Sequence, residues 1–395
     1  MQSKEGLLSK IVNDSRSVGI ILILCTVFSL IFSNISNGEN YIGFWNYAWE
    51  WPSWIGEKLP HDIMLIVNDI LMAFFFFMVG LEIKRELKVG ELSSLKQASF
   101  PVFAAVGGVL VPAGLYAIFN SGNPDTSHGW GIPMATDIAF ALGILALIAK
   151  RVPLGLKVIL AALAIIDDLM AIVVIALFYT GEESLSLLYL GLSIALIAIL
   201  VAMNMKKVRN ISLYIILGVL LWYLVYNSGV HATLAAVVLA FTIPMEKAPK
   251  LEQKLHIPVS FIVLPIFALA NTAIAFPSDF GAALNSNVSH GIMAGLMLGK
   301  PIGIFLLPFL MVKLKISSLP EGVFWKHILG IGMLSGIGFT MSIFISGLAF
   351  EDETYMDIAK ISVLIASLIS AFIGVIYLII IGNNKKQSEG KIKSI

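Results

Sequence analysis

The stretch ALAIIDDLMAIVVI, residues 162–175, places two adjacent aspartates, Asp167 and Asp168, inside a run that is otherwise apolar. A charged side chain at the centre of a membrane-spanning helix costs about 2.5–3.5 kcal/mol on insertion scales. Charges at such a depth are kept where they bind or move something, so this stretch marks a candidate site within a membrane.

Composition identifies the chain as an integral membrane protein. Of its 395 residues 58% are hydrophobic and 13% are charged, with a mean hydropathy of +0.91, far from the balance of a soluble domain. The net charge of +1, without a basic block, argues against a nucleic-acid partner. A single cysteine, Cys25, excludes an internal disulfide, and neither a zinc-binding histidine pair nor a nucleotide-binding glycine loop occurs. We therefore expect no cofactor.

Twelve apolar segments approach or reach the length of about 20 residues that a membrane-spanning helix needs. They are 17–33, 63–81, 98–119, 128–149, 154–178, 184–203, 211–226, 230–245, 256–275, 291–311, 328–350 and 358–382. The first follows basic residues, as in a signal peptide, but no small-x-small cleavage pattern comes after it, so we interpret it as an uncleaved helix. The sequence predicts an all-α integral membrane protein with twelve transmembrane helices in a single transporter domain, 1–395.

The lysines and arginines orient these segments. With a cytoplasmic N-terminus, 23 of the 26 basic residues, Lys84 among them, fall on the cytoplasmic side. Lys58 and Lys360 fall outside, and Lys300 is left inside a membrane segment. This distribution follows the positive-inside rule and predicts that both termini are cytoplasmic. The first outer loop, near 41–56, is aromatic and could pair with its copy in a dimer.

Five ionisable residues remain at membrane depth: Asp69, Asp137, Asp167, Asp168 and Lys300. All except Asp69, which could line an exit path or bond to a neighbour, lie near the midpoint of their segment. Unpaired, the five would cost about 12–18 kcal/mol, so we expect them to share a polar cavity. Consecutive helical residues point about 100° apart, so one of the adjacent aspartates could face Asp137 and the other Lys300. The alternative is a structural ion pair that locks two helices together.

Two of the segments contain residues that interrupt helices. Pro133 lies in segment 128–149, and Gly336 and Gly338 flank the midpoint of segment 328–350. Proline removes a backbone donor and glycine lowers helix stability, so these are candidate unwound points.

By the charge distribution these two segments cross the membrane in opposite directions. Paired interrupted helices in oppositely oriented halves point to the ion site of a transporter. We therefore predict inverted-topology repeats of three helices each, over about 98–178 and 290–382. The glycines at 295, 299 and 303 have the spacing used for close helix packing, and we assign them that role.

Six motifs, in order over nearly the whole chain, resemble the NhaA family of sodium/proton antiporters. They are GLEIKREL (80–87), GIPMATDIAFALG (131–143), LAIIDDL (163–169), SGVHATLA (228–235), GKPIGI (299–304) and SGIGFTMSIFI (335–345). Several long motifs in register are far more specific than one short pattern.

The resemblance implies two interrupted helices that cross at mid-membrane. It implies a cation site made by Asp167 and Asp168 with help from Thr136 and Asp137, and Lys300 as the partner of one aspartate. It also implies that Asp137 and Lys300 offset exposed helix ends, and that the protein forms dimers in a bacterial inner membrane. The family is itself one of the examples behind the general rule on inverted repeats.

These residues predict a secondary antiporter that exchanges cytoplasmic Na⁺ or Li⁺ for external H⁺, and not an enzyme. Desolvation and a neighbouring like charge favour the protonated form of a carboxylic acid, whereas deprotonated carboxylates offer the oxygen ligands that a hard cation needs. Competition would couple the two fluxes, and more than one proton per cation would make exchange electrogenic. A passive monovalent cation channel is the alternative. An intramembrane aspartate enzyme is disfavoured, since the GxGD and DDxxD motifs are absent.

A second group of titratable residues lies at the cytoplasmic face: Glu82, Arg85 and Glu86 in GLEIKREL, and Glu252 and His256 in KLEQKLH. The pattern alone is typical of a solvated salt-bridge surface. The resemblance favours a pH-responsive entrance, because histidine and coupled acids titrate near neutrality. His231 is expected to be a hydrogen-bonded structural histidine.

Overall fold

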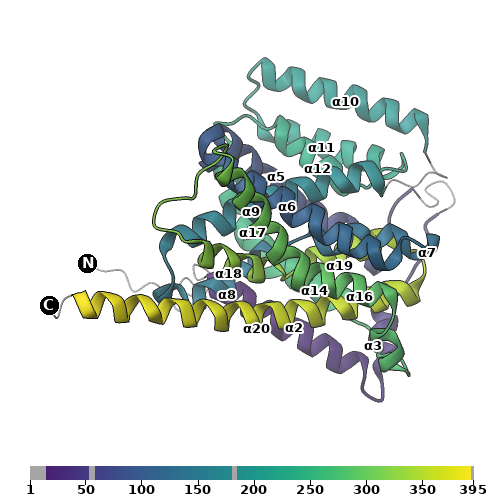
Figure 1. The fold of residues 1–395 in the computed structure, drawn as a ribbon. Helices are drawn as coiled ribbons and strands as arrows, with labels where there is room; N and C mark the ends of the chain where they lie inside the picture. The colour runs from purple at the N-terminus through teal and green to yellow at the C-terminus, as the bar shows by residue number, and fades with distance from the viewer. Residues whose placement is uncertain (1–14, 53–57, 180–184, 393–395) are drawn as a thin grey trace, which may run out of the picture. The chain divides into compact units, whose positions relative to one another are not determined.

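The computed structural model describes residues 15–52, 58–179 and 185–392. The predictions for both termini, and for part of the first outer loop, fall on residues outside these ranges. Within them the chain is helical, with one isolated antiparallel β-bridge between Ala48 and Asp62. The elements in chain order (Figure 1) are α2 Ser15–Ser33, α3 Gly38–Trp45, α4 Ile63–Leu65, η1 Ile66–Leu71, α5 Met72–Val89, η2 Glu91–Ser93, α6 Leu95–Asn120, α7 Pro124–Ser127, η3 His128–Met134, α8 Ile138–Leu147, η4 Ala149–Arg151, α9 Leu154–Phe178, α10 Leu187–Met205, α11 Ile211–Tyr226, α12 Thr233–Thr242, α13 Ala248–Pro258, η6 Val259–Val263, α14 Leu264–Asn271, α15 Phe280–Leu284, α16 Asn287–Ala294, η7 Gly295–Gly299, α17 Lys300–Lys313, α18 Trp325–Ser335, α19 Phe339–Ala349 and α20 Glu353–Ile392.

Eight helical stretches in the described part of the chain are long and apolar enough to cross a membrane. They are Arg16–Ser33, Ile63–Val89, Gln97–Asn120, Gly155–Phe178, Leu187–Met205, Ala248–Asn271, Asn287–Lys313 and Glu353–Gly382. Two bent helix pairs raise the number to ten. The other two predicted segments coincide with the shorter apolar helices α11 and α12. An all-helical membrane protein is confirmed, whereas the count of twelve spans stays a prediction.

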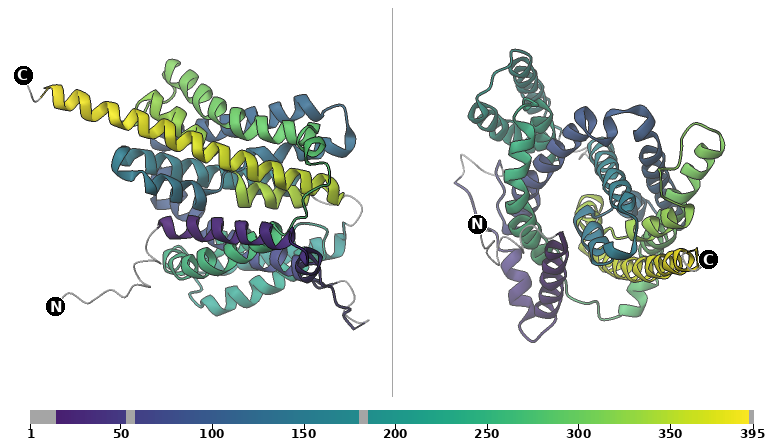
Figure 2. Two further views of the ribbon diagram at one scale, coloured as in Figure 1. Left: turned by 90° about the horizontal axis from the view of Figure 1, so that it is seen from below. Right: turned by 90° about the vertical axis from the view of Figure 1, so that its left-hand side faces the viewer.

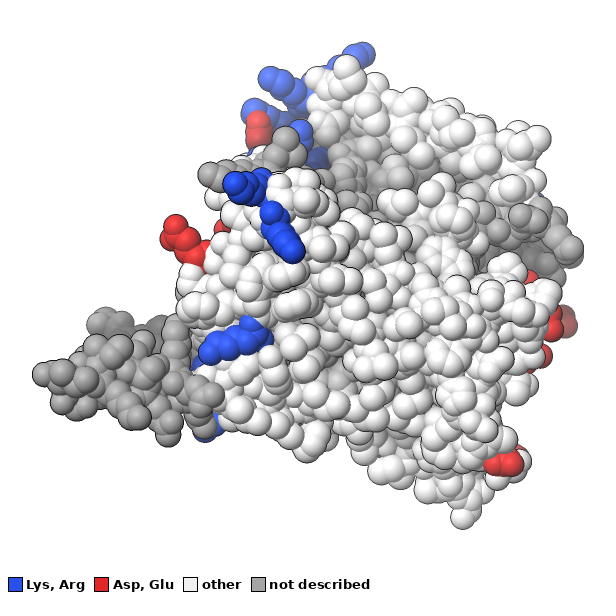
Figure 3. All heavy atoms as spheres, in the orientation of Figure 1, with Lys and Arg blue, Asp and Glu red and all other residues white. Residues whose placement is uncertain are grey.

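The surface agrees with a lipid environment. Charged side chains are few on the face drawn in Figure 3, and most of that surface is uncharged. Helix α10 is the extreme case, since only 17% of its most apolar window is buried inside the protein. Helix α20 continues as one helix of 40 residues (Figure 2), beyond the apolar stretch that ends at Gly382.

The chain divides into two compact units. Unit 1 contains Met1–Ile21, Glu91–Ala171 and Pro277–Ile395, and unit 2 contains Leu22–Gly90 and Ile172–Phe276. Unit 1 holds the whole of the second predicted repeat, 290–382, and the first as far as residue 171. Both interrupted helices and the adjacent aspartates therefore belong to one unit.

In unit 1, α6 packs backbone against backbone on the helical stretch formed by η7 and α17. A Cβ on Gly303 would collide with the carbonyl of Gly107, and a Cβ on Gly299 would meet Pro112 at 2.8 Å. A Cβ on Gly295 would meet the ring of Pro133 at 2.6 Å. The glycines at these positions serve close packing, as their spacing predicts.

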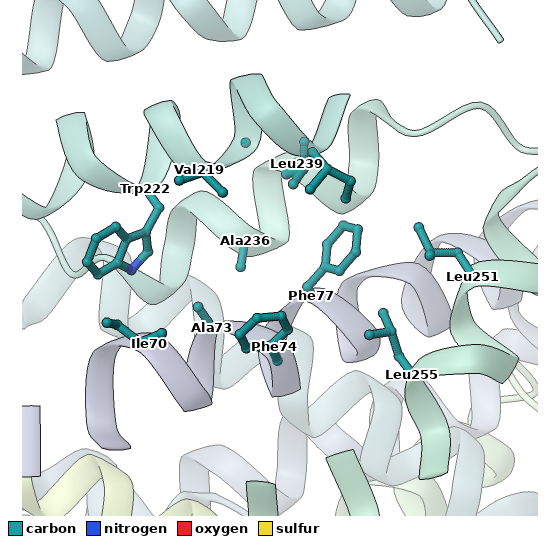
Figure 4. A pocket seen from close by; sticks show the side chains of 12 residues that line it. Ile70, Ala73, Phe74, Phe77, Val219, Trp222, Ala236, Leu239, Leu251 and Leu255 are labelled. Carbon is teal, nitrogen blue, oxygen red and sulfur yellow. The ribbon is translucent and has the colours of Figure 1, made fainter. Parts of the chain in front are cut away.

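In unit 2, an apolar groove runs between α5, α11, α12 and α13 (Figure 4). Its walls include Phe74 and Phe77 of α5, Trp222 of α11, Leu239 of α12 and Leu255 of α13. Because the lining is almost wholly apolar, this groove offers no ligands for an ion. The chemistry must lie elsewhere.

Two lysines are more buried than their placement beyond the apolar segments predicts, whereas the side of the membrane on which each lies stays a prediction. Lys84, counted as a cytoplasmic charge, is 8% exposed and lies within the continuous stretch Ile63–Val89. Its Nζ donates to the carbonyl of Phe241 at 2.7 Å and to that of Ile243, at the C-terminal end of α12. Lys360, assigned to the outside, is 6% exposed within α20. Both helices therefore extend beyond their apolar runs. A lysine is tolerated there because its aliphatic stem packs against apolar side chains while its amine reaches polar atoms.

Candidate functional site

The two interrupted helices meet at their breaks, within unit 1. The stretches Pro124–Met134 and Ile138–Leu147 are bent by 43° across the first break, and α18 and α19 by 50° across the second. The backbone N–H of Asp137, in the first break, donates to the carbonyl of Ile337, in the second, at 2.8 Å. Backbone groups that a continuous helix would pair internally are thus paired between the two breaks.

The residues expected to unwind these helices lie at the breaks. Gly336 and Gly338 fall between the end of α18 and the start of α19, and Pro133 lies in the 3₁₀ turn η3, just before the first break. Ser342 of α19 donates to the carbonyl of Ile132 at 2.7 Å, beside this proline. The two broken helices are therefore joined by side chains as well as by backbone.

The carboxylate of Asp137 caps two helices. Its Oδ1 accepts from the N–H of Phe140 at 2.8 Å, in the first turn of α8. Its Oδ2 accepts from the N–H of Thr340 at 3.2 Å and from the hydroxyl of the same residue at 2.5 Å, in the first turn of α19. Asp137 is 2% exposed. A carboxylate that is ionised between two helix N-termini is stabilised by both helix dipoles.

Asp167, on α9, accepts from two side chains at one oxygen. Its Oδ2 lies 2.5 Å from Nζ of Lys300 and 2.7 Å from Oγ1 of Thr136. All three residues are at least 99% buried. Its Oδ1 has no hydrogen-bond partner among the described residues. The carboxylate therefore keeps one oxygen available for a further ligand.

Asp168 is also buried, at 2% exposed, and interacts electrostatically with Lys300. Adjacent helical positions diverge by about 100°, so the two carboxylates approach the ammonium from different directions. Of the two aspartates, Asp167 takes the position facing Lys300. That an aspartate faces Asp137 stays a prediction, and both oxygens of the Asp137 carboxylate accept hydrogen bonds at the starts of α8 and α19.

Thr136 links the carboxylate of Asp167 to the second broken helix. Its Oγ1 lies 2.7 Å from Asp167 Oδ2 and 3.0 Å from the carbonyl oxygen of Ser335, the last residue of α18. Both neighbours are acceptors and a hydroxyl has one hydrogen, so Thr136 can donate to only one of them at a time. A polar link therefore runs from the acid pair to the end of α18.

Lys300 begins α17, directly after the π-helical turn η7. A π-turn shifts the register of the side chains that follow it and is common at functional sites. Helix α6 lies close to the Lys300 side chain at Gly108. A Cβ added to Gly108 would lie 3.7 Å from Lys300 Nζ. The ammonium of Lys300 thus sits in a closely packed site and points at Asp167.

The sequence analysis missed three groups at this site. They are the hydroxyl of Thr340 on Asp137, the carbonyl of Ser335 on Thr136, and the hydroxyl of Ser367 on α20, which accepts from the N–H groups of Gly338 and Phe339. Thr340 and Ser335 lie inside the motif SGIGFTMSIFI, which could have indicated them. Ser367 has no comparable signal.

The cytoplasmic-side group is partly assembled in unit 2. Arg85 Nε lies 3.0 Å from Glu252 Oε2, and Arg85 Nη1 lies 2.7 Å from Glu86 Oε1. Glu82 interacts electrostatically with Glu252, Arg85 and Glu86. His256 is exposed, one helical turn beyond Glu252 on α13. Three acids therefore surround one arginine, which joins α5 to α13.

Two remaining candidates have structural contacts. His231 is hydrogen-bonded to the backbone of Tyr179, the kind of contact expected of a structural histidine. Asp69 lies in the π-turn η1, where its carbonyl accepts from the indole N–H of Trp222 at 3.2 Å. This contact uses the backbone of Asp69, and the role of its side chain stays a prediction.

Buried acids beside an ammonium, at the meeting point of two broken helices, define a secondary ion transporter. Within the described ranges no three His, Cys, Asp or Glu side chains cluster as a site for a resident metal.

Comparison with known proteins agrees with this class. The family model described as Na+/H+ antiporter 1 matches residues 9–378, and the chain belongs to this family. It is 48% identical over 380 residues to the Na(+)/H(+) antiporter NhaA 2 of Flavobacterium johnsoniae, which covers 95% of this chain and 92% of that protein. It is 48% identical over 377 residues to the NhaA of Flavobacterium psychrophilum, covering 93% and 94%, and 47% identical over 379 residues to that of Citrobacter koseri, covering 93% and 96%.

Proposed function

We propose that this chain is an Na⁺/H⁺ antiporter that exchanges cytoplasmic Na⁺, or Li⁺, for external H⁺ at Asp167 and Asp168. The observation that carries the proposal is the burial of these two acids with Lys300, next to the contact between two broken helices. Membership of an antiporter family supports the same function. The relatives named above are all called Na⁺/H⁺ antiporters.

The cation takes oxygen ligands from both carboxylates. Thr136 Oγ1 lies beside Asp167, the carbonyl of Ser335 lies beside Thr136, and both offer further oxygens. Small hard cations bind such oxygens in preference to nitrogen or sulfur. Lys300 pairs with Asp167 while no cation is bound, and the arriving cation replaces the ammonium.

Protons and cations compete for the same carboxylates. Binding of a cation requires deprotonated acids, and binding of protons removes the negative charge that holds the cation. Only the loaded forms of the site switch between the two sides of the membrane, because an empty pair of buried carboxylates is costly to move. Competition alone then couples the two fluxes.

More than one proton moves per cation, so exchange is electrogenic. One net charge per cycle couples exchange to the membrane potential by about 2.3 kcal/mol per 100 mV. That energy supports an extra sodium gradient of roughly fiftyfold per 100 mV. An inside-negative potential therefore drives sodium out of the cell.

The group around Arg85 gives the exchanger its pH response. Glu82, Glu86 and Glu252 share one arginine, and a change in their protonation alters the ion pair between α5 and α13. His256 is the exposed titratable neighbour on α13. This response serves sodium and pH homeostasis and salt tolerance.

The finer architecture follows the family. The chain spans the membrane twelve times in a bacterial inner membrane, with both termini in the cytoplasm, and forms one transporter domain. Segments 98–178 and 290–382 are inverted repeats whose broken helices cross near the midplane. The working unit is a homodimer, and transport needs no cofactor.

Inside-out vesicles loaded with a pH-sensitive dye test the function. Addition of Na⁺ or Li⁺, but not K⁺, should dissipate an imposed proton gradient. Asp168→Asn should abolish this signal, whereas Asp125→Asn, at an exposed outer turn, should keep it. Undiminished exchange by Asp168→Asn would contradict the assignment of the site.

The same vesicles distinguish the alternatives. A pH gradient should accumulate ²²Na⁺ against its own gradient, which a passive cation channel cannot do. An intramembrane aspartate enzyme would leave the dye signal unchanged by Na⁺.

A further inference from the structure

The start of α19 has to satisfy its backbone donors inside the protein. The first N–H groups of a helix have no partner within the helix. Here Phe339 and Thr340 are 3% and 2% exposed, so solvent cannot satisfy them. A buried N–H without an acceptor costs about 1–3 kcal/mol. The break between α18 and α19 therefore depends on acceptors from other elements.

Two side chains from different elements share this task. The N–H of Thr340 donates to Asp137 Oδ2 at 3.2 Å. The N–H groups of Gly338 and Phe339 donate to Oγ of Ser367, on α20, at 3.2 and 3.1 Å. Ser367 is 5% exposed. At the start of α19, the Ser367 hydroxyl thus accepts from the first two N–H groups, and the Asp137 carboxylate accepts from the third.

We propose that Ser367 is a positioning residue for ion exchange, and this rests on the function proposed above. By holding the N-terminal end of α19, Ser367 sets the position of Thr340 relative to Asp137. That position is tied to the ion site, because Asp137 is followed by α8 and preceded by Thr136, which contacts Asp167. Ser367 itself does not touch the acid pair.

Loss of the hydroxyl would redistribute the donors at the break. Without Ser367 Oγ, the N–H groups of Gly338 and Phe339 would turn toward the Asp137 carboxylate, which already accepts from the next residue, Thr340. A carboxylate that accepts from more donors moves toward α19. The backbone of Asp137, whose N–H donates to Ile337, then shifts, and the adjacent Thr136 shifts with it. The Thr136 hydroxyl, a proposed ligand of Na⁺ beside Asp167, is then displaced from the ion site.

Three serine variants separate this role from ordinary packing. Ser367→Ala removes the acceptor, and Ser367→Thr keeps it. Ser362→Ala is the matched control, since Ser362 lies on the same helix and bonds only to its own helix, at the carbonyl of Ile358. The assay is Na⁺-dependent dissipation of a proton gradient in vesicles, with apparent KM and maximal rate measured separately for Na⁺.

We expect Ser367→Ala to raise the apparent KM for Na⁺ about three- to tenfold, the equivalent of one or two neutral hydrogen bonds. Ser367→Thr should restore the wild-type KM, and Ser362→Ala should keep it. A normal KM in Ser367→Ala, or an equal rise in Ser362→Ala, would overturn the proposal.

Hydrogen–deuterium exchange provides a test that does not depend on transport. Peptides covering residues 336–342 of the purified full-length protein should exchange at least several times faster in Ser367→Ala than in wild type or Ser362→Ala. Should Ser367→Ala fold poorly, Ser367→Cys, whose thiol is a weaker acceptor, should show an intermediate effect. Unchanged exchange would refute the cap even if the protein proved not to be an antiporter. Faster exchange without any Na⁺-dependent signal in wild type would instead count against the proposed function.

Discussion

Replacing Asp137 with asparagine tests how the two broken helices are held together. The donors at this carboxylate include the N–H of Phe140, the N–H of Thr340 and the hydroxyl of Thr340. Asparagine offers one carbonyl oxygen, so it can cap α8 or α19 but not both. The Thr340 hydroxyl can rotate to accept from the new amide, which leaves one buried N–H without a partner.

The cost follows from these contacts. An unsatisfied buried N–H costs about 1–3 kcal/mol, and loss of a charge at two helix N-termini costs about 0.3–2 kcal/mol each. We expect Asp137→Asn to destabilise the protein by about 2–5 kcal/mol. On the scale of about 2–4 °C per kcal/mol for domains of 150–250 residues, Tm should fall by roughly 4–20 °C. Thermal unfolding of the protein in detergent, followed by intrinsic fluorescence, measures this shift.

Asp352→Asn is the matched control. Asp352 also caps a helix start, accepting from the N–H of Thr354 at 2.7 Å, and this hydrogen bonding lowers the pKa of the Asp352 carboxyl. The Asp352 side chain is fully exposed, so water can replace the hydrogen bonds that the substitution removes. A Tm for Asp137→Asn no lower than that of Asp352→Asn would refute the role of Asp137 at the two breaks.

Three further predictions concern packing and regulation. Gly303→Ala should lower Tm, because the added Cβ would collide with the backbone of Gly107 and overpacking costs about 1–3 kcal/mol. Gly114→Ala is the control and should leave Tm unchanged, because a Cβ at Gly114 would lie in open space. Lys84→Met should destabilise by about 2–4 kcal/mol, because two carbonyls at the end of α12 lose a charged donor; equal melting of Lys84→Met and wild type would contradict this. Glu252→Gln should shift the pH profile of exchange in vesicles without changing the apparent Na⁺ affinity, and an unmoved profile would favour a solvated salt-bridge surface.

The charged residues of the site were predictable from the sequence because a charge in an apolar segment has few explanations. Asp137, Asp167, Asp168 and Lys300 stand out by depth alone, and the glycines of the motif SGIGFTMSIFI mark the second break. The family resemblance added Thr136. Each of these residues is chemically conspicuous against its surroundings.

Hydroxyl and backbone contacts were not predictable in the same way. A serine in an apolar helix bonds by default to a carbonyl of its own helix, as Ser362 does, and nothing in the sequence distinguishes Ser367 from it. The π-turns leave no composition signal either, although η7 directly precedes Lys300. The depth of Lys84 was missed because hydropathy marks where an apolar run ends and not where its helix ends.

The most direct measurement is the release of protons when Na⁺ binds to the purified protein in weakly buffered detergent solution. We predict that Na⁺ displaces protons in proportion to site occupancy, and that a variant carrying both Asp167→Asn and Asp168→Asn neither binds Na⁺ nor releases protons. Saturating Na⁺ binding with no proton release would show that the ion and the protons do not compete, and would contradict the proposed exchange.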